Sequence, residues 1–211
     1  MKKHLFTIII TCFLINSVKA QTEDNILWSQ LSLHKKFDEK NALYITPTLR
    51  TNNNLKSYQN SSIDIHYAHK VYKHWGLGFI SRTWFVPDAG DRQFLWFDIR
   101  YSTSINAIKV FSGLRYHLAL DINENIDPDF IRWKTKLTFP SFGILTPHLA
   151  IEPWLRLNGF EQLQLVRYEP GVDLQLQKNL KLSMTYWRQE TINLEPNSNF
   201  NIYVVKATYS I

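Results

Sequence analysis

The sequence has a single cysteine, and it lies close to the N-terminus. Cys12 falls within a segment that we expect to be removed, so residues 21–211 contain no cysteine. A disulfide, a thiol nucleophile and a cysteine-ligated metal site are therefore excluded from that part of the chain. A secreted protein without disulfides must obtain its stability from a large core or from a membrane.

Long apolar runs and clusters of basic residues are missing as well. After residue 20, no apolar stretch approaches the length of a transmembrane helix. The formal net charge of +6 includes Lys2, Lys3 and Lys19, which leaves +3 on residues 21–211. No stretch has the clustered lysines and arginines that binding to nucleic-acid phosphates would need. We therefore expect no nucleic-acid partner.

Residues 1–20 have the layout of a secretory signal peptide. Lys2 and Lys3 precede an apolar run over residues 5–15, and small or modest side chains follow at residues 18–20. A cationic head, an apolar stretch too short to span a bilayer and a small-residue exit are typical of a cleaved signal, the alternative being an N-terminal membrane anchor. We expect cleavage after Ala20 and a single domain over residues 21–211.

The rest of the chain alternates between apolar and polar residues, which is the period of a β-strand. Residues 43–50 and 95–102 are typical, and eleven such segments follow one another without a convincing amphipathic helix. Short connections at 38–40, 72–74, 141–143 and 177–179 alternate with longer polar ones at 51–60, 87–92, 121–129 and 191–199. This regular alternation predicts an all-β fold, an antiparallel up-and-down transmembrane β-barrel of 10–12 strands, rather than a Greek-key sandwich.

Two features do not fit a simple barrel of this kind. Bacterial single-chain barrels have even strand numbers, so with eleven segments we expect a partial N-terminal strand or one segment outside the wall. Prolines also interrupt the segments, where each removes a hydrogen-bond donor of the sheet, and we expect bulges near them. They are Pro47, Pro147, Pro153 and Pro170.

A soluble lipocalin-like barrel also alternates, but with its apolar face inside. Two observations favour the opposite arrangement, with the apolar face towards lipid. Gly76, Gly78, Gly113 and Gly171 fall on the polar face, where small residues relieve crowding in a narrow lumen. The polar face is also rich in arginine, whose planar group pairs well with confined carboxylates. The apolar face carries aromatic residues that suit membrane interfaces: Trp75, Trp133, Tyr101, Tyr116, Tyr168, Tyr186 and Tyr209.

Several segments also share their order and spacing with a known family. They are ILWSQLSLHKKF, YITPTLR, SSIDIHYAHKV, WGLGFISRTWF, QFLWFDIRY, VFSGLRYHL, LTPHLAIEPWLR, LVRYEPGVDLQL and LKLSMTYWRQE. In these segments the chain resembles the bacterial family known as domain of unknown function 2490, although its strands are richer in tryptophan. The resemblance implies an outer-membrane barrel of Gram-negative bacteria and carries no established activity.

Charged residues on the polar face are the candidate functional set. We expect a charge network in the lumen made of Arg50, Asp64, Arg82, Asp98, Arg100, Arg115, Arg132, Glu152, Arg156, Arg167, Glu169 and Asp173. One interpretation is a polar lumen that binds a small solute or passes it as a channel. The other is a structural plug of salt bridges that keeps a small barrel rigid.

No residue pattern supports catalysis, a metal or another cofactor. His34, His66, His117 and His148 fall on the polar face but are far apart in the sequence, so we expect hydrogen-bonded lumen residues. Ser81 and Ser112 lie on the apolar face without a histidine, and the loop carboxylates also lack one: Asp88, Asp91, Asp121, Asp127 and Asp129. The function expected is therefore structural or ligand-binding and not enzymatic, with a surface hydrolase or a periplasmic lipocalin-like carrier as alternatives.

The C-terminal segment predicts partners in the cell envelope. Tyr203, Val205, Ala207 and Tyr209 alternate up to Ile211, which replaces the usual terminal aromatic residue. Resembling proteins use such a strand as the signal for the barrel assembly machinery. We expect a protein of the bacterial outer membrane that contacts this machinery, membrane lipid and lipopolysaccharide.

Overall fold

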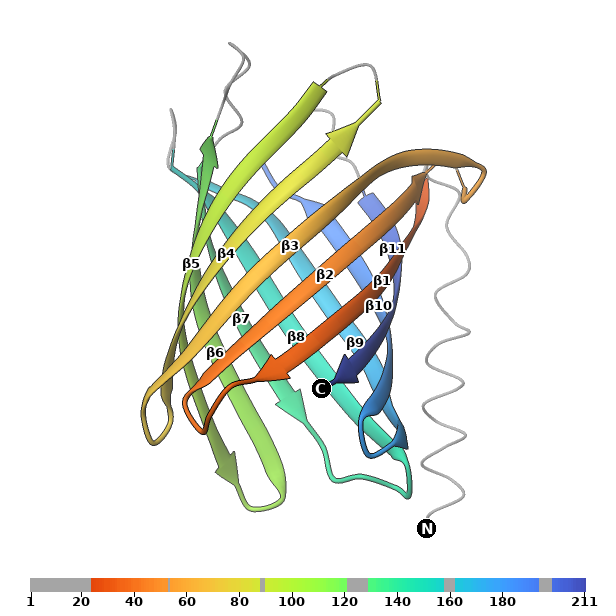
Figure 1. The fold of residues 1–211 in the computed structure, drawn as a ribbon. Helices are drawn as coiled ribbons and strands as arrows, with labels where there is room; N and C mark the ends of the chain where they lie inside the picture. Colours follow the sequence, from red (N-terminus) through yellow and green to blue (C-terminus); the bar gives the residue numbers. More distant parts are fainter. Residues whose placement is uncertain (1–23, 53, 88–89, 121–128, 158–161, 194–198) are drawn as a thin grey trace.

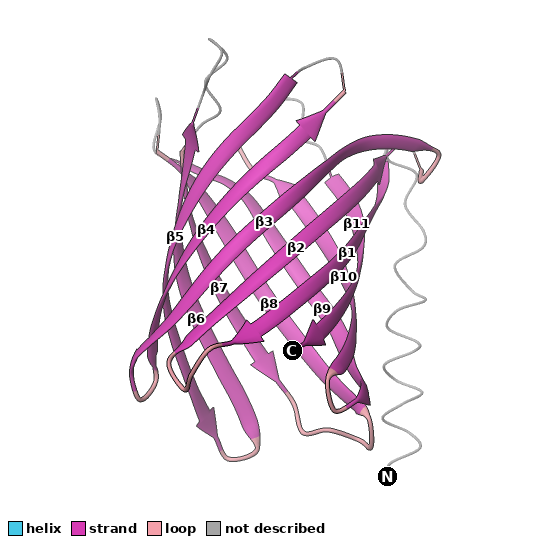
Figure 2. Ribbon diagram, viewed as in Figure 1, coloured by secondary structure: helices cyan, strands magenta, loops and turns pink. Residues whose placement is uncertain are grey.

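The computed structural model describes residues 24–52, 54–87, 90–120, 129–157, 162–193 and 199–211. The signal peptide expected at residues 1–20 and the loop carboxylates Asp88, Asp121 and Asp127 lie outside these ranges. Every element in the described residues is a β-strand (Figure 2). Within the same residues, no helix is long and apolar enough to cross a membrane.

The described residues form eleven strands, which are tilted and pair side by side into one closed barrel wall (Figure 1). They are β1 (Asp24–Lys36), β2 (Asn41–Asn52), β3 (Ser57–Tyr72), β4 (Trp75–Val86), β5 (Gly90–Ile105), β6 (Ile108–Leu120), β7 (Phe130–Thr138), β8 (Leu145–Arg156), β9 (Gln162–Gln177), β10 (Leu180–Thr191) and β11 (Asn199–Ser210). Each corresponds to one segment of the alternating pattern. The prediction of an all-β up-and-down barrel of 10–12 strands is confirmed.

The closing seam of the barrel is parallel. Consecutive strands pair antiparallel, as β1 does with β2 and β10 with β11, whereas β1 pairs in parallel with β11. The seam runs from Asp24 opposite Phe200 to His34 opposite Ser210. Up-and-down strands alternate in direction, so the first and last of an odd number point the same way. Expecting a partial strand or a segment outside the wall was therefore wrong, because a parallel seam closes the odd number.

The connections at the two ends of the barrel differ. One end, called the turn rim, has the connections 37–40, 73–74, 106–107, 139–144 and 178–179. The other end, called the loop rim, has 53–56, 87–89, 121–129, 157–161 and 192–198. Long connections over 51–60 and 87–92 were expected and are wrong, because β3 and β5 extend into them. Sheet hydrogen bonds join backbone groups, so polar side chains do not end a strand that extends beyond the apolar wall.

The first turn of the turn rim is held by one aspartate. Asp38 accepts hydrogen bonds from the Asn41 side chain and from the backbone N–H groups of Lys40 and Asn41, each at 2.7 Å. The bond from the Asn41 side chain, followed by the two backbone bonds, holds the pKa of the Asp38 carboxyl below its ordinary value. The short β1–β2 connection is therefore fixed by its own side chains.

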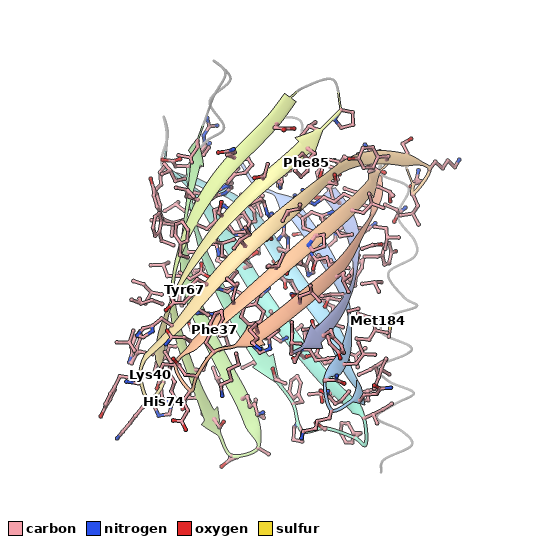
Figure 3. The ribbon with its side chains drawn as sticks, in the orientation of Figure 1. Phe37, Lys40, Tyr67, His74, Phe85 and Met184 are labelled. Carbon is pink, nitrogen blue, oxygen red and sulfur yellow. The ribbon has the colours of Figure 1, made fainter. Side chains whose placement is uncertain are left out.

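The two faces of the wall have opposite polarity. On β2, Leu49 is 48% exposed on the outer face while its neighbour Arg50 is 1% exposed on the inner face. Figure 3 shows side chains projecting from both sides of the strands, among them the labelled Tyr67 and Phe85, which are exposed on the outside. Buried apolar residues form two small inner clusters, Ile26 with Ile202 and Val204, and Ile80 with Phe94 and Trp96.

Glycine and proline positions follow from this crowded interior. A Cβ atom at Gly113 would lie 2.8 Å from the Phe111 ring, and one at Gly171 would lie 2.5 Å from His148 Nε2. The inner glycines therefore make room for neighbouring side chains, as the sequence indicated. The strands continue through all four prolines, and only Pro153 lies beside a register shift, between Trp154 and Leu155.

Candidate functional site

Five arginines and five tryptophans point into the lumen in the half of the barrel nearer the loop rim. The arginines are Arg50 on β2, Arg82 on β4, Arg115 on β6, Arg132 on β7 and Arg167 on β9; the tryptophans are Trp28 on β1, Trp84 on β4, Trp96 on β5, Trp154 on β8 and Trp187 on β10. We call this set the Arg–Trp layer. Strand alternation directs each of these side chains inward, and the tilt of the strands brings residues distant in sequence to the same height.

Each guanidinium of the layer lies over at least one indole ring. The distance from the guanidinium carbon to the ring centroid is 3.8 Å for Arg132 over Trp154 and 4.1 Å for Arg82 over Trp96. Arg50 lies between two rings, 4.2 Å from Trp28 and 4.8 Å from Trp84. Arg115 and Arg167 make the same kind of contact, with Trp96 at 4.8 Å and Trp187 at 4.3 Å. Such cation–π contacts strengthen when water is excluded, so the tryptophans stabilise the buried charges.

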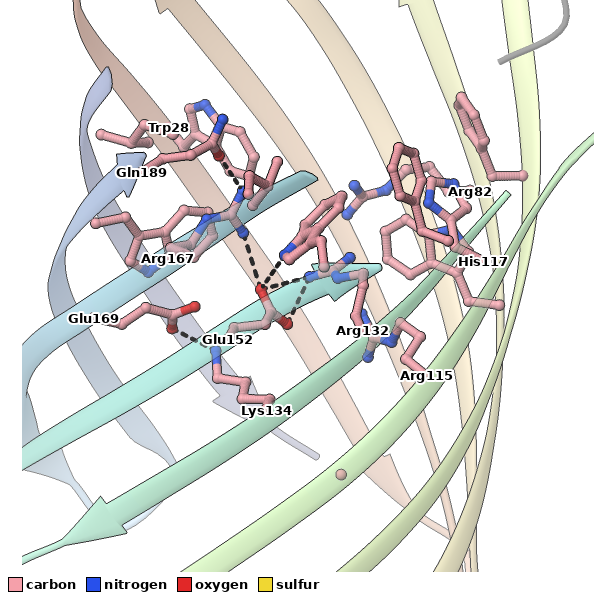
Figure 4. A pocket seen from close by; sticks show the side chains of 18 of the residues that line it. Trp28, Arg82, Arg115, His117, Arg132, Lys134, Glu152, Arg167, Glu169 and Gln189 are labelled. Atoms are coloured by element: carbon pink, nitrogen blue, oxygen red, sulfur yellow. Dashed lines mark hydrogen bonds and ion pairs between the residues drawn. The ribbon is translucent and has the colours of Figure 1, made fainter. Parts of the chain in front are cut away.

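Carboxylates neutralise part of this charge. Glu152 on β8 is the main acceptor: it accepts from Arg132 Nη2 at 2.8 and 2.9 Å, from Arg167 Nη1 at 3.2 Å and from Trp154 Nε1 at 3.1 Å (Figure 4). Gln189 extends the group by accepting from Arg167 Nη2 at 2.7 Å. Glu152 thus connects strands β7, β8 and β9 through charged hydrogen bonds, which are about twice as strong as neutral ones.

Three further ion pairs lie around the same layer. Asp98 accepts two hydrogen bonds from Arg115, at 2.5 and 2.8 Å. Asp64 binds Arg82 in the same two-bonded manner. Glu169 pairs with Lys134, which lies on the inner face of β7 (Figure 4).

Arg50 has no carboxylate partner among the described residues. Its side chain is 1% exposed, and its Nη1 donates to Asn60 Oδ1 at 3.0 Å. Its Nη2 lies 3.5 Å from Ser62 Oγ. The charge of Arg50 is therefore held by two indole faces and neutral oxygens rather than by an opposite charge.

The remaining predicted residues also face inward but lie apart from the layer. Arg100 donates from Nη2 to the backbone oxygen of Leu77 at 2.7 Å. Asp173 lies nearer the turn rim, 3.6 Å from Lys181 and 3.9 Å from His148. Arg156 lies at the loop-rim end of β8, and its Nε has no hydrogen-bond partner in the described part of the chain. The twelve predicted residues therefore all line the inner wall, nine of them in or beside the Arg–Trp layer.

Sequence reasoning missed the aromatic half of the site and Lys134. Trp96, Trp154 and Trp187 fall on the polar face of their segments, and this pattern is the signal that could have identified them. Glu169 was identified without its partner, because pairing between β7 and β9 passes across β8 and does not follow from alternation within one strand.

The histidines take separate places in the lumen. His34 and His66 lie on either side of the Tyr44 ring, with centroids 4.4 and 5.2 Å away. His117 contacts the rings of Phe94 and Trp96, whereas His148 lies by Asp173 as described above. Among the described residues, no group of three or more His, Cys, Asp or Glu side chains is placed to hold a metal ion.

The described residues enclose two cavities along the lumen. The larger, the chamber, has a volume of about 590 Å³ and is lined by the Arg–Trp layer and the apolar residues nearest the loop rim. The smaller, the basin, has about 480 Å³ and lies at the turn rim, lined in part by Lys36, Lys40, Lys70 and Lys73. Arg100 and Phe111 line both cavities and so lie between them. The interior is therefore not filled by side chains, and the chamber has the size of a small-molecule site.

Comparison with known proteins identified no relatives: no family model, no curated protein and no solved structure matches the chain.

Proposed function

We propose that this protein is an integral barrel of the outer membrane of Gram-negative bacteria and that its lumen binds a small solute. Membership of domain of unknown function 2490, which the order of the strand segments suggested, is part of this proposal. The chemistry of the wall and of the lumen supports it in separate ways.

The inverted polarity of the wall is the observation that carries the membrane assignment. Outward-facing apolar side chains recur around the barrel; Ile65, Leu77 and Ile99 are each about half exposed, at 48%, 48% and 51%. Soluble proteins rarely expose one large continuous apolar surface, whereas lipid stabilises it. A lipocalin-like carrier would need the reverse arrangement, with its charged residues outside.

Aromatic residues near the strand ends fit the two membrane interfaces. Tyr67, Tyr72 and Trp75 lie outside near the turn rim, and Tyr58 and Phe85 near the loop rim. Trp133 and Tyr168 lie near the middle of their strands instead. Aromatic side chains at lipid headgroup level anchor a barrel because they are apolar with a polar edge.

The ends of the barrel suggest its orientation. Outer-membrane barrels keep short turns in the periplasm, which assigns the turn rim to that side. The last strand ends there, and the backbone N–H of Ile211 donates to the His34 oxygen at 2.9 Å. This placement suits recognition of β11 by the barrel assembly machinery, with phospholipid around the turn rim and lipopolysaccharide around the loop rim.

The membrane assignment is tested by cell fractionation together with electrophoresis of unheated and heated samples. We expect the protein in the outer-membrane fraction and a faster-migrating band before heating, because closed barrels resist detergent until boiled. Recovery as a soluble periplasmic protein would contradict the proposal.

A small channel is the second candidate function. The chamber and the basin share Arg100 and Phe111, so the two cavities are separated by few side chains. Conductance across planar bilayers containing the purified barrel tests this function: discrete open-channel currents would support it, and electrically silent insertion would leave solute binding alone.

A further inference from the structure

The chamber is chemically different at its two ends. Towards the loop rim its wall carries the apolar residues Ile26, Phe94 and Phe200, near the beginning of their strands, beside the uncharged polar residues Asn60 and Gln189. Towards the middle of the barrel the wall carries the cations Arg115 and Lys134. A ligand that lies along the barrel axis would therefore contact apolar rings at one end and positive charges at the other.

Positive charge exceeds negative charge in the chamber wall. Among the described residues, seven cationic side chains line the chamber against three carboxylates: Arg50, Arg82, Arg100, Arg115, Arg132, Lys134 and Arg167 against Asp98, Glu152 and Glu169. Arg50 has no carboxylate partner in the described part of the chain, and Arg100 donates to a backbone oxygen. Even when Asp64 is counted with its partner Arg82, the wall retains a net positive charge.

Hydrogen-bond donors are in excess as well. In the described residues, the buried Nε atoms of Arg50, Arg132 and Arg167 and the indole nitrogens of Trp28, Trp84, Trp96 and Trp187 have no acceptor. Only one buried carboxylate oxygen of the chamber wall, Glu169 Oε1, lacks a donor in the same residues. A wall of this composition favours a ligand that supplies negative charge and acceptor oxygens.

Two of the cations are accessible within the lumen. The side chains of Arg115 and Lys134 are 26% and 30% exposed although each is paired with a carboxylate that is at most 5% exposed. Each cation therefore has one side bound to its partner and another side open to the chamber. An anionic group placed between them would gain charge-assisted hydrogen bonds without breaking the existing pairs.

From this arrangement we propose that the chamber is a binding site for an amphiphilic organic anion. The ligand class is a carboxylate or phosphate ester with an apolar body: the anionic head lies at Arg100, Arg115 and Lys134, and the body lies against the apolar end. This inference rests on the proposed solute-binding function and specifies its ligand.

The basin gives such an anion a route into the chamber. Lys36, Lys40, Lys70 and Lys73 line it together with Arg100, against two carboxylates, Asp38 and Glu39. A charged recess with low-dielectric walls concentrates ions of the opposite sign. The anion reaches the chamber past Arg100 and Phe111, which line both cavities.

Isothermal titration calorimetry of the barrel in lipid nanodiscs tests the ligand class. The probes are 4-phenylbutyrate, 4-phenylbutyl phosphate, the neutral 4-phenylbutanol and acetate, with empty nanodiscs as the blank. We expect each phenyl-bearing anion to bind at least tenfold more tightly than the alcohol and than acetate. Equal binding of anion and alcohol, or no binding of either anion, would overturn the inference.

A matched pair of variants locates the site. Arg100→Gln removes a cation that pairs with no carboxylate within 4 Å in the described residues, so we expect it to weaken 4-phenylbutyrate binding at least fivefold and leave 4-phenylbutanol unchanged. Lys178→Gln removes one exposed cation in the β9–β10 turn, outside both cavities, and should change neither. Equal effects of the two variants would overturn the placement.

Two further measurements keep the outcome decisive. If Arg100→Gln does not fold, raising NaCl from 50 to 500 mM on the unaltered barrel must weaken anion binding and spare the alcohol, and a salt-independent affinity overturns the inference. Heat-modifiable migration is recorded on every preparation. A folded membrane barrel without anion preference refutes this inference alone, whereas a protein that does not form a membrane barrel refutes the proposed function.

Discussion

An arginine inside a narrow barrel loses most of its hydration, and the groups that replace water decide whether its charge is tolerated. Arg132 is compensated by Glu152 and by the Trp154 ring, whereas Arg50 has two rings and neutral oxygens. The guanidinium suits both surroundings because it is weakly hydrated and stacks on aromatic faces. Lysine, a compact and strongly hydrated charge, would not replace arginine at Arg50.

Glu152 should be the most sensitive carboxylate of the layer. Glu152→Gln keeps the volume but leaves Arg132 and Arg167 without their carboxylate, and removal of one partner from a buried ion pair costs about 3–5 kcal/mol. We expect this loss in the free energy of urea unfolding in lipid vesicles. Glu190→Gln is the control, because Glu190 is 45% exposed and its ion pair with Arg188 is long, at 3.7 Å. Equal stability of the two variants would argue against the network.

Gly113 should tolerate a methyl group only if Phe111 is made smaller. Gly113→Ala places a Cβ atom 2.8 Å from the Phe111 ring, and crowding of this kind costs about 1–3 kcal/mol. The double variant with Phe111→Ala should regain part of that stability in a double-mutant cycle of unfolding free energies. Additive losses would show that the ring does not oppose the methyl group.

At the scale of the strands, alternation was enough to predict eleven strands, whereas the glycines and arginines on the polar face were needed to predict that this face lies inside. Leu49 and Arg50 are adjacent and lie on opposite faces, because successive side chains of a strand alternate, which is a local property of the backbone. The parallel seam could not be predicted, because it depends on the direction of β1 relative to β11, at the two ends of the chain. Contacts between strands that are not neighbours, such as the one between Arg167 and Trp28, depend on strand tilt and could not be predicted from the sequence either.

The seam can be tested by cysteine pairing, since residues 21–211 contain no cysteine. Leu31 and Ala207 are register partners across β1 and β11, on the outer face. Adjacent strands lie ~4.8 Å apart, within reach of a disulfide, whereas strands two apart lie at ~10 Å. We expect Leu31→Cys with Ala207→Cys to form a disulfide on mild oxidation, seen as a mobility shift before reduction.

The control for the seam pairs Leu31→Cys with Leu182→Cys, because Leu182 faces Ala207 one strand further along, on β10. That pair should remain reduced under the same conditions. Disulfide formation in the control and not in the seam pair would place β1 beside β10 and contradict closure by β11.

For the whole molecule, the excess of positive charge in the lumen determines the potential that a solute meets there, although the net charge of the chain is small. The chamber and the basin are both lined by an excess of cations, so an anion meets an attractive potential from the turn rim to the middle of the barrel. The apolar outer wall contributes to the same effect, because low-dielectric surroundings weaken the screening of charges inside.

Phe111 should limit passage between the two cavities, because its ring lines both and lies against Gly113. Phe111→Ala removes the ring and retains Arg100, so we expect a several-fold rise in conductance across planar bilayers with chloride preferred over potassium. Phe142→Ala, which removes a 54% exposed ring outside both cavities, should leave conductance unchanged. A Phe111→Ala barrel that conducts no better than the Phe142→Ala control would mean that other side chains separate the cavities. A rise without anion preference would mean that Arg100 does not set the selectivity of the passage.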